Sequence, residues 1–253
     1  MSICIPVSIS NVSSLERLQF QKNKLSGEVP SLEKLNRLQF FFITPNNLGN
    51  GGANNWHFPC SLTNSTYLSL LAINVNNFGG ELSKCIGNFS TTLTRLCVDN
   101  NKIFGKIPIE IENLINLESL EMWNNKLSGN IPIEIGKLEK LQYLSLSQNI
   151  FTGTIPSSLG NLTILTVLHL YQNNLQGGIP FSVSKCRNLI RLNLAYNNLS
   201  RSIPSQVIGL SFSPIFLDFF VNQFTGVLPM EIGNFKNLER LDISENMLFG
   251  KIP

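Results

Sequence analysis

Six residues between positions 123 and 196 have side chains suited to binding a ligand. Aromatic residues and arginine bury a large area while keeping a polar handle, so clusters of them mark surfaces that recognise peptides and proteins. Aromatic residues also favour strands for reasons unrelated to function, which is the alternative explanation. The candidates are Trp123, Tyr143, His169, Tyr171, Arg191 and Tyr196.

The same sequence offers no pattern that catalysis would need. The two histidines, His57 and His169, are far apart and no nucleophile pattern accompanies them, and no G-x-x-x-x-G-K-[ST] phosphate loop occurs. The five cysteines are scattered rather than grouped in metal-binding pairs. We therefore predict a chain that is not an enzyme and that holds neither a cofactor nor a metal.

A repeat of 24 residues must position the candidate residues. Residues 117–180 align as three lines with the pattern L-x-x-L-x-L-x-x-N-x-L, followed by Gly and Ile-Pro. A fixed period of about 20 to 30 residues with this pattern is typical of leucine-rich repeats, which stack into a solenoid. We predict an α/β repeat solenoid, a leucine-rich repeat horseshoe or superhelix, with a parallel β-sheet on its concave face and about ten repeats.

One asparagine in each repeat is expected to join neighbouring coils. Its short amide side chain can turn inward and hydrogen-bond the backbone of adjacent coils. The residues three and five positions before it, such as Leu144 and Leu146 before Asn149, should point into the core. The residues between them should then face outward on the concave side. The ladder consists of Asn23, Asn46, Asn76, Asn101, Asn125, Asn149, Asn173, Asn197, Asn222 and Asn246.

Each repeat continues with a Gly, an Ile-Pro or close variant, and a return segment of loop or short helix. Arg201 stands where the other repeats have this Gly, and the sequence offers no reason for it. The step from Asn46 to Asn76 is 30 residues, so we expect an irregular insertion at about 47–62 that protrudes from the coil. Residues 1–253 are predicted to form a single repeat domain.

Composition and the chain ends limit the class of protein further. The net charge of +3 comes without a block of like charge, which argues against nucleic acid as a partner. No apolar run is long enough for a membrane helix, and MSICIPVSIS lacks the features of a signal peptide. The sequence begins in the second half of a repeat and stops within another, without capping units, so we expect a domain truncated at both ends.

The extended motif L-x-x-L-x-L-x-x-N-x-L-x-G-x-I-P-x-x-[IL]-G resembles the plant-type repeat of plant leucine-rich-repeat receptor kinases. Segments 56–66 (WHFPCSLTNST), 85–96 (CIGNFSTTLTRL) and 210–222 (LSFSPIFLDFFVN) are similar to the subfamily of receptors for bacterial elongation factor and rice bacterial blight. This resemblance implies an ectodomain outside the plasma membrane, a transmembrane helix, an intracellular Ser/Thr kinase and a co-receptor kinase. The kinase lies outside this chain, so the resemblance assigns no catalytic residue here.

Five N-x-[ST] sequons are candidates for N-glycosylation. Four of them fall five residues after the repeat's proline position, on the convex return, where sugars would leave the concave face open. The alternative is that they are consensus asparagines of the repeat without a sugar. The candidates are Asn11, Asn64, Asn88, Asn161 and, outside this pattern, Asn198.

The cysteines divide into one candidate pair and three single residues. Cys60 and Cys85 occupy nearly equivalent convex positions one coil apart, so they are candidates for a disulfide. Cys186 stands in an apolar column and is expected to be a small buried hydrophobe. Cys4 and Cys97 have no evident partner.

Together these features predict the ligand-binding ectodomain of a plant cell-surface receptor kinase. It would recognise a peptide or protein on its concave face and signal in defence or development. Two other interpretations stay open: a secreted leucine-rich repeat inhibitor of microbial cell-wall hydrolases, and a non-functional truncated gene product. The sequence downstream of the chain would separate them, whereas the ligand depends on solvent-facing positions that the fold leaves free.

Overall fold

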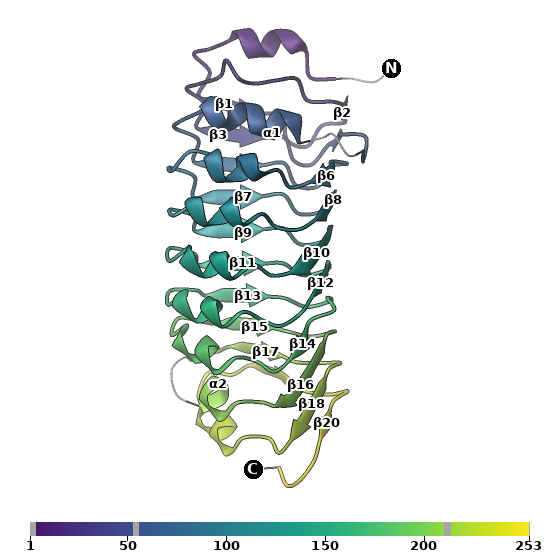
Figure 1. The fold of residues 1–253 in the computed structure, drawn as a ribbon, viewed down its shortest axis with the longest axis vertical. Helices are drawn as coiled ribbons and strands as arrows, with labels where there is room; N and C mark the ends of the chain where they lie inside the picture. The colour runs from purple at the N-terminus through teal and green to yellow at the C-terminus, as the bar shows by residue number, and fades with distance from the viewer. Residues whose placement is uncertain (1–3, 53–55, 210–213, 253) are drawn as a thin grey trace. The chain divides into compact units, whose positions relative to one another are not determined.

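The fold is given by a computed structural model that describes residues 4–52, 56–209 and 214–252 (Figure 1). The chain forms two compact units, Met1–Leu127 and Ser128–Pro253, and each is a stack of repeat coils. In the part of the chain that is described, no helix is long and apolar enough to cross a membrane. That residues 1–253 form one domain stays a prediction.

The main sheet of the first unit is built from parallel strands in sequence order, with their residues paired in register. These strands are β1 (Arg17–Gln19), β3 (Phe40–Phe42), β5 (Leu70–Ala72), β7 (Arg95–Cys97) and β9 (Ser119–Glu121). The strands on a second side are β2 (Ser26–Gly27), β4 (Asn47–Leu48), β6 (Gly79–Glu81) and β8 (Lys102–Gly105). The return segments are η1 (Val7–Asn11), α1 (His57–Ser61), η2 (Leu62–Asn64), η3 (Lys84–Asn88) and η4 (Ile109–Asn113), where η denotes a 3-10 helix.

The second unit repeats this plan. Its main strands are β11 (Tyr143–Ser145), β13 (Val167–His169), β15 (Arg191–Asn193), β17 (Phe216–Asp218) and β19 (Arg240–Asp242). Its second side holds β12 (Ile150–Thr152), β14 (Gln176–Gly177), β16 (Asn198–Ser202), β18 (Gln223–Gly226) and β20 (Met247–Leu248), and β10 (Lys126–Asn130) pairs with β12 through Ser128–Asn130. Its helices are η5 (Ile133–Lys137), η6 (Ser157–Asn161), η7 (Phe181–Lys185), α2 (Ser205–Gly209) and η8 (Met230–Asn234).

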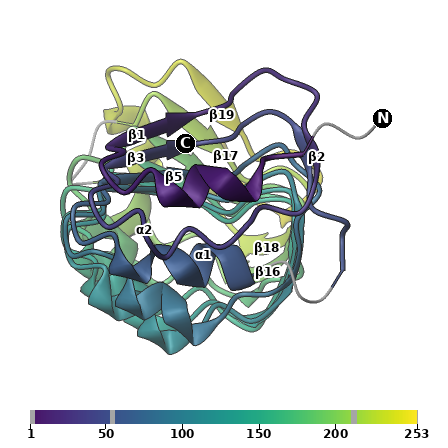
Figure 2. The same ribbon diagram turned by 90° about the horizontal axis from the view of Figure 1, so that it is seen from above.

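The core of each unit lies between its main strands and its helices, which Figure 2 shows on opposite sides. The middle residue of each main strand and the residue two positions later point into it, as Leu144 and Leu146 do with no exposed surface. Because one coil has too few apolar residues to cover its own leucines, burial requires stacking on a neighbour. The predicted leucine-rich repeat fold is confirmed. We call the opposite, outward-facing surface of the main strands the strand face.

The ladder asparagines hydrogen-bond the backbone of two coils. In Asn173, Nδ2 donates to the carbonyl oxygen of Leu146 (3.0 Å) on the preceding coil, and Oδ1 accepts from the Phe151 amide (3.0 Å). Asn101, Asn125 and Asn197 make the same set of bonds. Asn149 donates to the Leu146 carbonyl within its own coil. Each side chain therefore supplies hydrogen bonds to backbone groups that have no partner within a strand or helix.

Arg201 has a left-handed backbone, with φ of +67°. The glycines in this column of the other repeats have φ between +74° and +95°, a region in which a Cβ atom is disfavoured. We expect Arg201→Gly to raise the free energy of unfolding by about 1 kcal/mol, since relieved strain exceeds the entropy that glycine adds to the unfolded chain. Urea unfolding measures the change, and Arg201→Ala is the control because it keeps the strained Cβ. An equal gain in both variants would contradict the backbone explanation.

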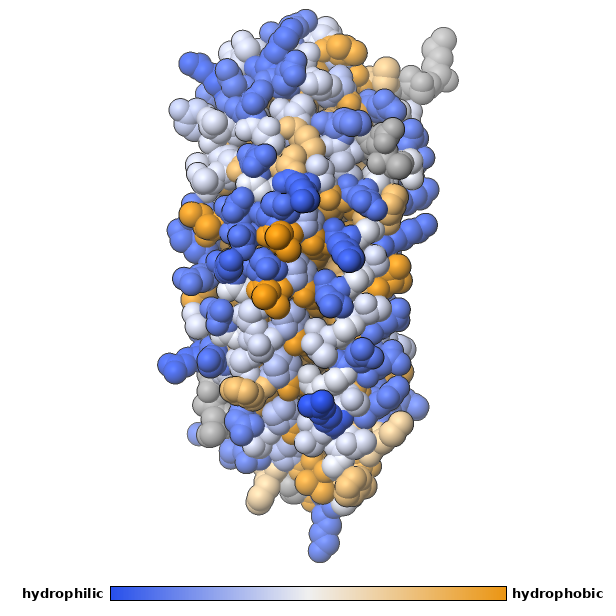
Figure 3. Space-filling model, in the orientation of Figure 1, coloured by the Kyte–Doolittle hydropathy of each residue, from blue (hydrophilic) through white to orange (hydrophobic). Residues whose placement is uncertain are grey.

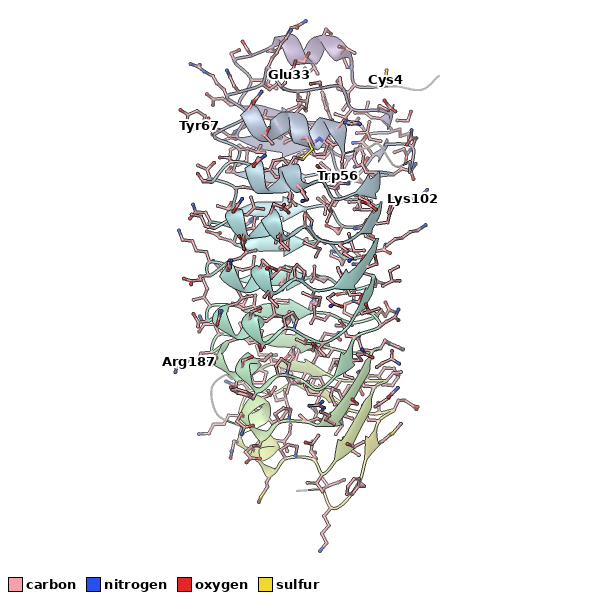
Figure 4. The ribbon with its side chains drawn as sticks, in the orientation of Figure 1. Cys4, Glu33, Trp56, Tyr67, Lys102 and Arg187 are labelled. Atoms are coloured by element: carbon pink, nitrogen blue, oxygen red, sulfur yellow. A yellow bond between two sulfur atoms is a disulfide. The ribbon has the colours of Figure 1, made fainter. Side chains whose placement is uncertain are left out.

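The sequence predicts that the insertion at about 47–62 protrudes, but from Trp56 onward it is anchored in the core. Residues 53–55 of the insertion lie outside the described residues. Phe58 of α1 packs against Phe41 and Phe78, with ring centroids 6.1 and 5.1 Å away, and Trp56 is buried. The predicted pair Cys60 and Cys85 is joined as a disulfide near Trp56 (Figure 4). Apolar side chains thus hold the extra residues against the neighbouring coils.

Candidate ligand-binding face

Three aromatic rings form a connected patch on the strand face of the second unit. Tyr143, at the start of β11, meets His169, at the end of β13, edge to face at 6.0 Å between ring centroids. His169 meets Tyr171 in the same manner at 6.1 Å. All three side chains are half-buried, so part of each remains open to a ligand. We call Tyr143, His169 and Tyr171 the aromatic patch.

His169 acts as an aromatic group rather than as a cation in this patch. Burial lowers the pKa of its imidazole below the ordinary value of 6.5, and the positive charge of Arg191 lowers it further. The ring is therefore neutral at neutral pH and can accept or donate a hydrogen bond without attracting anions.

Arg191 presents an exposed guanidinium next to the patch, because β15 pairs with β13 and places Arg191 opposite Val167. It forms no ion pair with any residue that the structure describes. Arg240, two strands further, is different: it contacts Asp218 and Asp242 at 3.7 Å and lies over the ring of Phe216. Of these two arginines, only Arg191 has its charge available to a ligand.

The remaining two predicted residues lie apart from the patch. Tyr196 is exposed, sits at the turn before Asn197 with φ of +54°, and stacks edge to face on Phe220 at 5.1 Å. Trp123 belongs to the first unit, where it is half-buried. The strand face also includes Phe216, Phe220 and Arg240, which were not among the six candidates although they occupy the same outward columns of the repeat.

Several residues in the outward columns are buried, so the expectation that these columns face the solvent is wrong at those positions. Ser147 and Ala195 of the second unit are buried, and so is Asp99 of the first. These residues are shorter than the aromatic or amide side chains beside them, so their neighbours cover them. Outward direction in a strand is therefore not sufficient for access when the next coil is about 5 Å away.

Asp99 is a buried acid on the strand face of the first unit. Its Oδ2 accepts hydrogen bonds from Nδ2 of Asn100 (2.9 Å) and of Asn74 (3.4 Å), whereas its Oδ1 has no partner among the described residues. Burial raises the pKa of this carboxyl to about 6, the bond from Asn100 opposes the rise, and the charge of Glu121 adds to it. Near neutral pH the fold therefore holds an ionised carboxylate at a cost in stability.

We expect Asp99→Asn to stabilise the protein above pH 6. Because the folded pKa lies above the unfolded value of 3.8, ionisation costs stability as the pH rises from about 4 to 6, and about 1.4 kcal/mol accompanies each unit of separation. The variant should exceed the wild type at pH 7.5 and match it near pH 4. Urea unfolding of both proteins at the two pH values checks this, since Glu121, Cys97 and Arg95 nearby are the same in both. A difference in the free energy of unfolding that is the same at pH 7.5 and pH 4 would contradict this explanation.

The predicted glycosylation sites are all exposed. Asn11, Asn64, Asn88 and Asn161 are the last residues of η1, η2, η3 and η6, whereas Asn198 opens β16. The side bearing the helices is mostly polar with scattered apolar residues (Figure 3). Four sites therefore lie away from the strand face, and their glycosylation stays a prediction.

Fold and site together define a leucine-rich repeat protein with an open strand face. Residues 92–114, 116–138, 140–162, 165–186 and 188–210 match the Leucine Rich Repeat family. The chain is 41% identical over 89 residues to the LRR receptor-like serine/threonine-protein kinase EFR of Arabidopsis thaliana. It is 46% identical over 65 residues to the receptor kinase-like protein Xa21 of Oryza sativa subsp. japonica. These matches cover 35% and 26% of the chain but only 9% and 6% of the relatives.

Solved structures of plant receptors are similar to this chain over its full length. The plant peptide hormone receptor RGFR1 in complex with RGF2 superimposes with a TM-score of 0.91 and 33% identity, covering 100% of this chain and 39% of that one. The Arabidopsis receptor kinase HAESA, in complex with the peptide hormone IDA and the co-receptor SERK1, has a TM-score of 0.90, 33% identity and coverages of 100% and 41%. The chain therefore carries leucine-rich repeats, and it is similar in sequence and structure to plant leucine-rich-repeat receptor-like kinases.

The fold alone does not decide the function. A plant ice-binding protein also matches, with a TM-score of 0.73 and 26% identity, covering 100% of this chain and 71% of that protein. Function must therefore be argued from the side chains on the strand face.

Proposed function

We propose that the chain is a ligand-binding part of a plant receptor-like kinase ectodomain and that it recognises a peptide or protein on the strand face of the second unit. The observation that carries this is the aromatic patch beside the unpaired guanidinium of Arg191. Half-buried aromatic rings held by their neighbours lose little entropy on binding, and an arginine without an internal partner can pair with a ligand.

The related structures support a peptide as the ligand. RGFR1 and HAESA are seen with peptide hormones, and HAESA also with the co-receptor SERK1. By analogy, a co-receptor kinase is the second partner, and the parent protein resides in the plasma membrane with the chain on its extracellular side. Signalling in defence is favoured by the resemblance to EFR and Xa21, and the kinase reaction belongs to the parent's intracellular domain.

Tyr171→Ala should weaken binding of peptides selected from a displayed library on the wild-type protein by about 30-fold, the effect of losing a central aromatic contact worth about 2 kcal/mol. Trp123→Ala tests the candidate of the first unit in the same assay. Tyr67→Ala is the matched control, because Tyr67 is an exposed tyrosine outside the main strands. Selected peptides that bind the wild type and Tyr171→Ala equally well would remove the patch from the proposal.

A further inference from the structure

The coil that carries β19 leaves its core residues open to water. In the coil before it, the core residues of the main strand, Leu217 and Phe219, have no exposed surface. The equivalent residues of the β19 coil, Leu241 and Ile243, are half-exposed, and η8 contains no buried residue. Core positions of a repeat are buried only when a neighbouring coil covers them. We call the half-exposed apolar residues of this coil the end face: Ile232, Phe235, Leu238, Leu241, Ile243 and Leu248.

Strand β19 also has an open edge. Among the described residues, no strand pairs with the side of β19 that faces away from β17. The Arg240 amide donates to the Ile215 carbonyl oxygen at 3.1 Å, toward the preceding coil. The Asp242 carbonyl oxygen accepts from the Phe219 amide of that coil at 2.7 Å. Since alternate residues of a strand bond to opposite sides, the N–H and C=O of Leu241 point outward and can pair with another strand.

The charges of β19 suit a second copy of the same strand in antiparallel orientation. With Leu241 opposite Leu241 of the second copy, the two residues exchange N–H to C=O hydrogen bonds. Arg240 of each copy then stands opposite Asp242 of the other, because these residues flank Leu241 on either side. Two pairs of opposite charge therefore face each other across a twofold axis, an arrangement that stabilises cross-strand pairing.

Pairing of β19 with β1 of another copy is disfavoured. Arg17 and Arg240 are the first residues of their strands and occupy the same column of the repeat, so a parallel pairing in the repeat register places two arginines side by side. The core residue of β1, Leu18, is only 4% exposed, so the β1 end offers little apolar surface for contact. The twofold arrangement also closes after two copies, whereas β19-to-β1 pairing would continue into a filament.

We propose that the chain forms a twofold-symmetric dimer through the end face and antiparallel pairing of two β19 strands. Each copy covers the apolar residues of the other as the next coil covers them elsewhere in the second unit. Burial of this surface drives the association, and the charges of β19 fix its register. The inference goes beyond the proposed function, since the aromatic patch takes no part in the contact.

Sedimentation equilibrium of the full chain tests the proposal and should give twice the mass of one chain at micromolar concentration. Arg240→Asp should raise the dissociation constant of the dimer at least about tenfold, because like charges then face each other twice. Adding Asp242→Arg to this variant should restore the dissociation constant to within about threefold, since opposite charges again meet across the axis. Arg187→Asp is the control, because it makes the same charge change at an exposed residue of another coil (Figure 4).

Three results would overturn the dimer: a monomer at every concentration up to about 0.1 mM, species larger than two copies, or a double variant that associates no better than Arg240→Asp. Unfolding temperatures of all variants are measured as well, because Arg240→Asp also removes the internal contact with Asp218 at 3.7 Å. The double variant lacks the same contact, so recovery of its dimer reports pairing across the axis rather than repair of the fold.

Discussion

Asn173→Ala is expected to lower the free energy of unfolding by about 3 kcal/mol, because it leaves several buried backbone groups without partners. The Asn173 side chain is the hydrogen-bond partner of the Phe151 amide and of the Leu146 and Leu170 carbonyl oxygens, at 3.0 to 3.1 Å. The asparagine is 7% exposed, so water cannot replace it in the folded state. Urea unfolding followed by circular dichroism measures the change as a shift in midpoint.

The neighbouring residue offers a matched control. Asn174 is exposed, and none of its side-chain atoms takes part in a described hydrogen bond, so Asn174→Ala should change the stability by less than about 0.5 kcal/mol. Similar losses for the two variants would mean that asparagine stabilises this turn through its local conformation rather than through the bonds between coils.

Gly160→Ala is expected to lower the free energy of unfolding by about 3 kcal/mol, at the upper end of the cost of overpacking. Gly160 lies in η6, where the next coil passes close to its backbone. A Cβ atom at this position would overlap the carbonyl oxygen of Ser182 and lie 2.7 Å from the Ser182 Cβ. Because the obstacle is backbone and not the end of a flexible side chain, the coils must separate locally. Thermal unfolding would show the loss.

Gly233→Ala is the control for the glycine effect, since Gly233 occupies the equivalent place in η8 and no atom lies within 4 Å of its added Cβ. The alanine should leave stability unchanged or raise it by about 0.5 kcal/mol, through the reduced entropy of the unfolded chain. Equal destabilisation at both positions would show that the glycines are needed for backbone conformation and not for the approach of the coils.

The aromatic patch illustrates how far a repeat pattern predicts a site. Period and alternation place Tyr143, His169 and Tyr171 on one face, and the structure brings their rings together. The pattern does not separate Arg191 from Arg240, because both occupy the same column. Only Asp218 of the preceding coil and Asp242 of the same strand make Arg240 an internal ion-pair partner, whereas Arg191 has no such acids beside it.

The sequence predicts only part of the backbone conformation. The Gly column predicts a bend, and its positive φ values follow from glycine's lack of a Cβ. The residue directly before the ladder asparagine also has a positive φ in nine coils, yet residues as different as Val75, Tyr196 and Asn124 occupy this position. Residues of very different types adopt this conformation, so no residue preference reveals it.

The sequence by itself determined the repeat, the leucine core, the asparagine ladder and the face that each column occupies, because each of these depends on a period shared by every coil. The tertiary structure alone decided which outward side chains remain accessible. Asp99, Ser147 and Ala195 face outward but are buried, and Phe58 turns an expected protrusion into core. Access and pairing depend on the sizes and charges of side chains one coil away, which the repeat leaves free to vary.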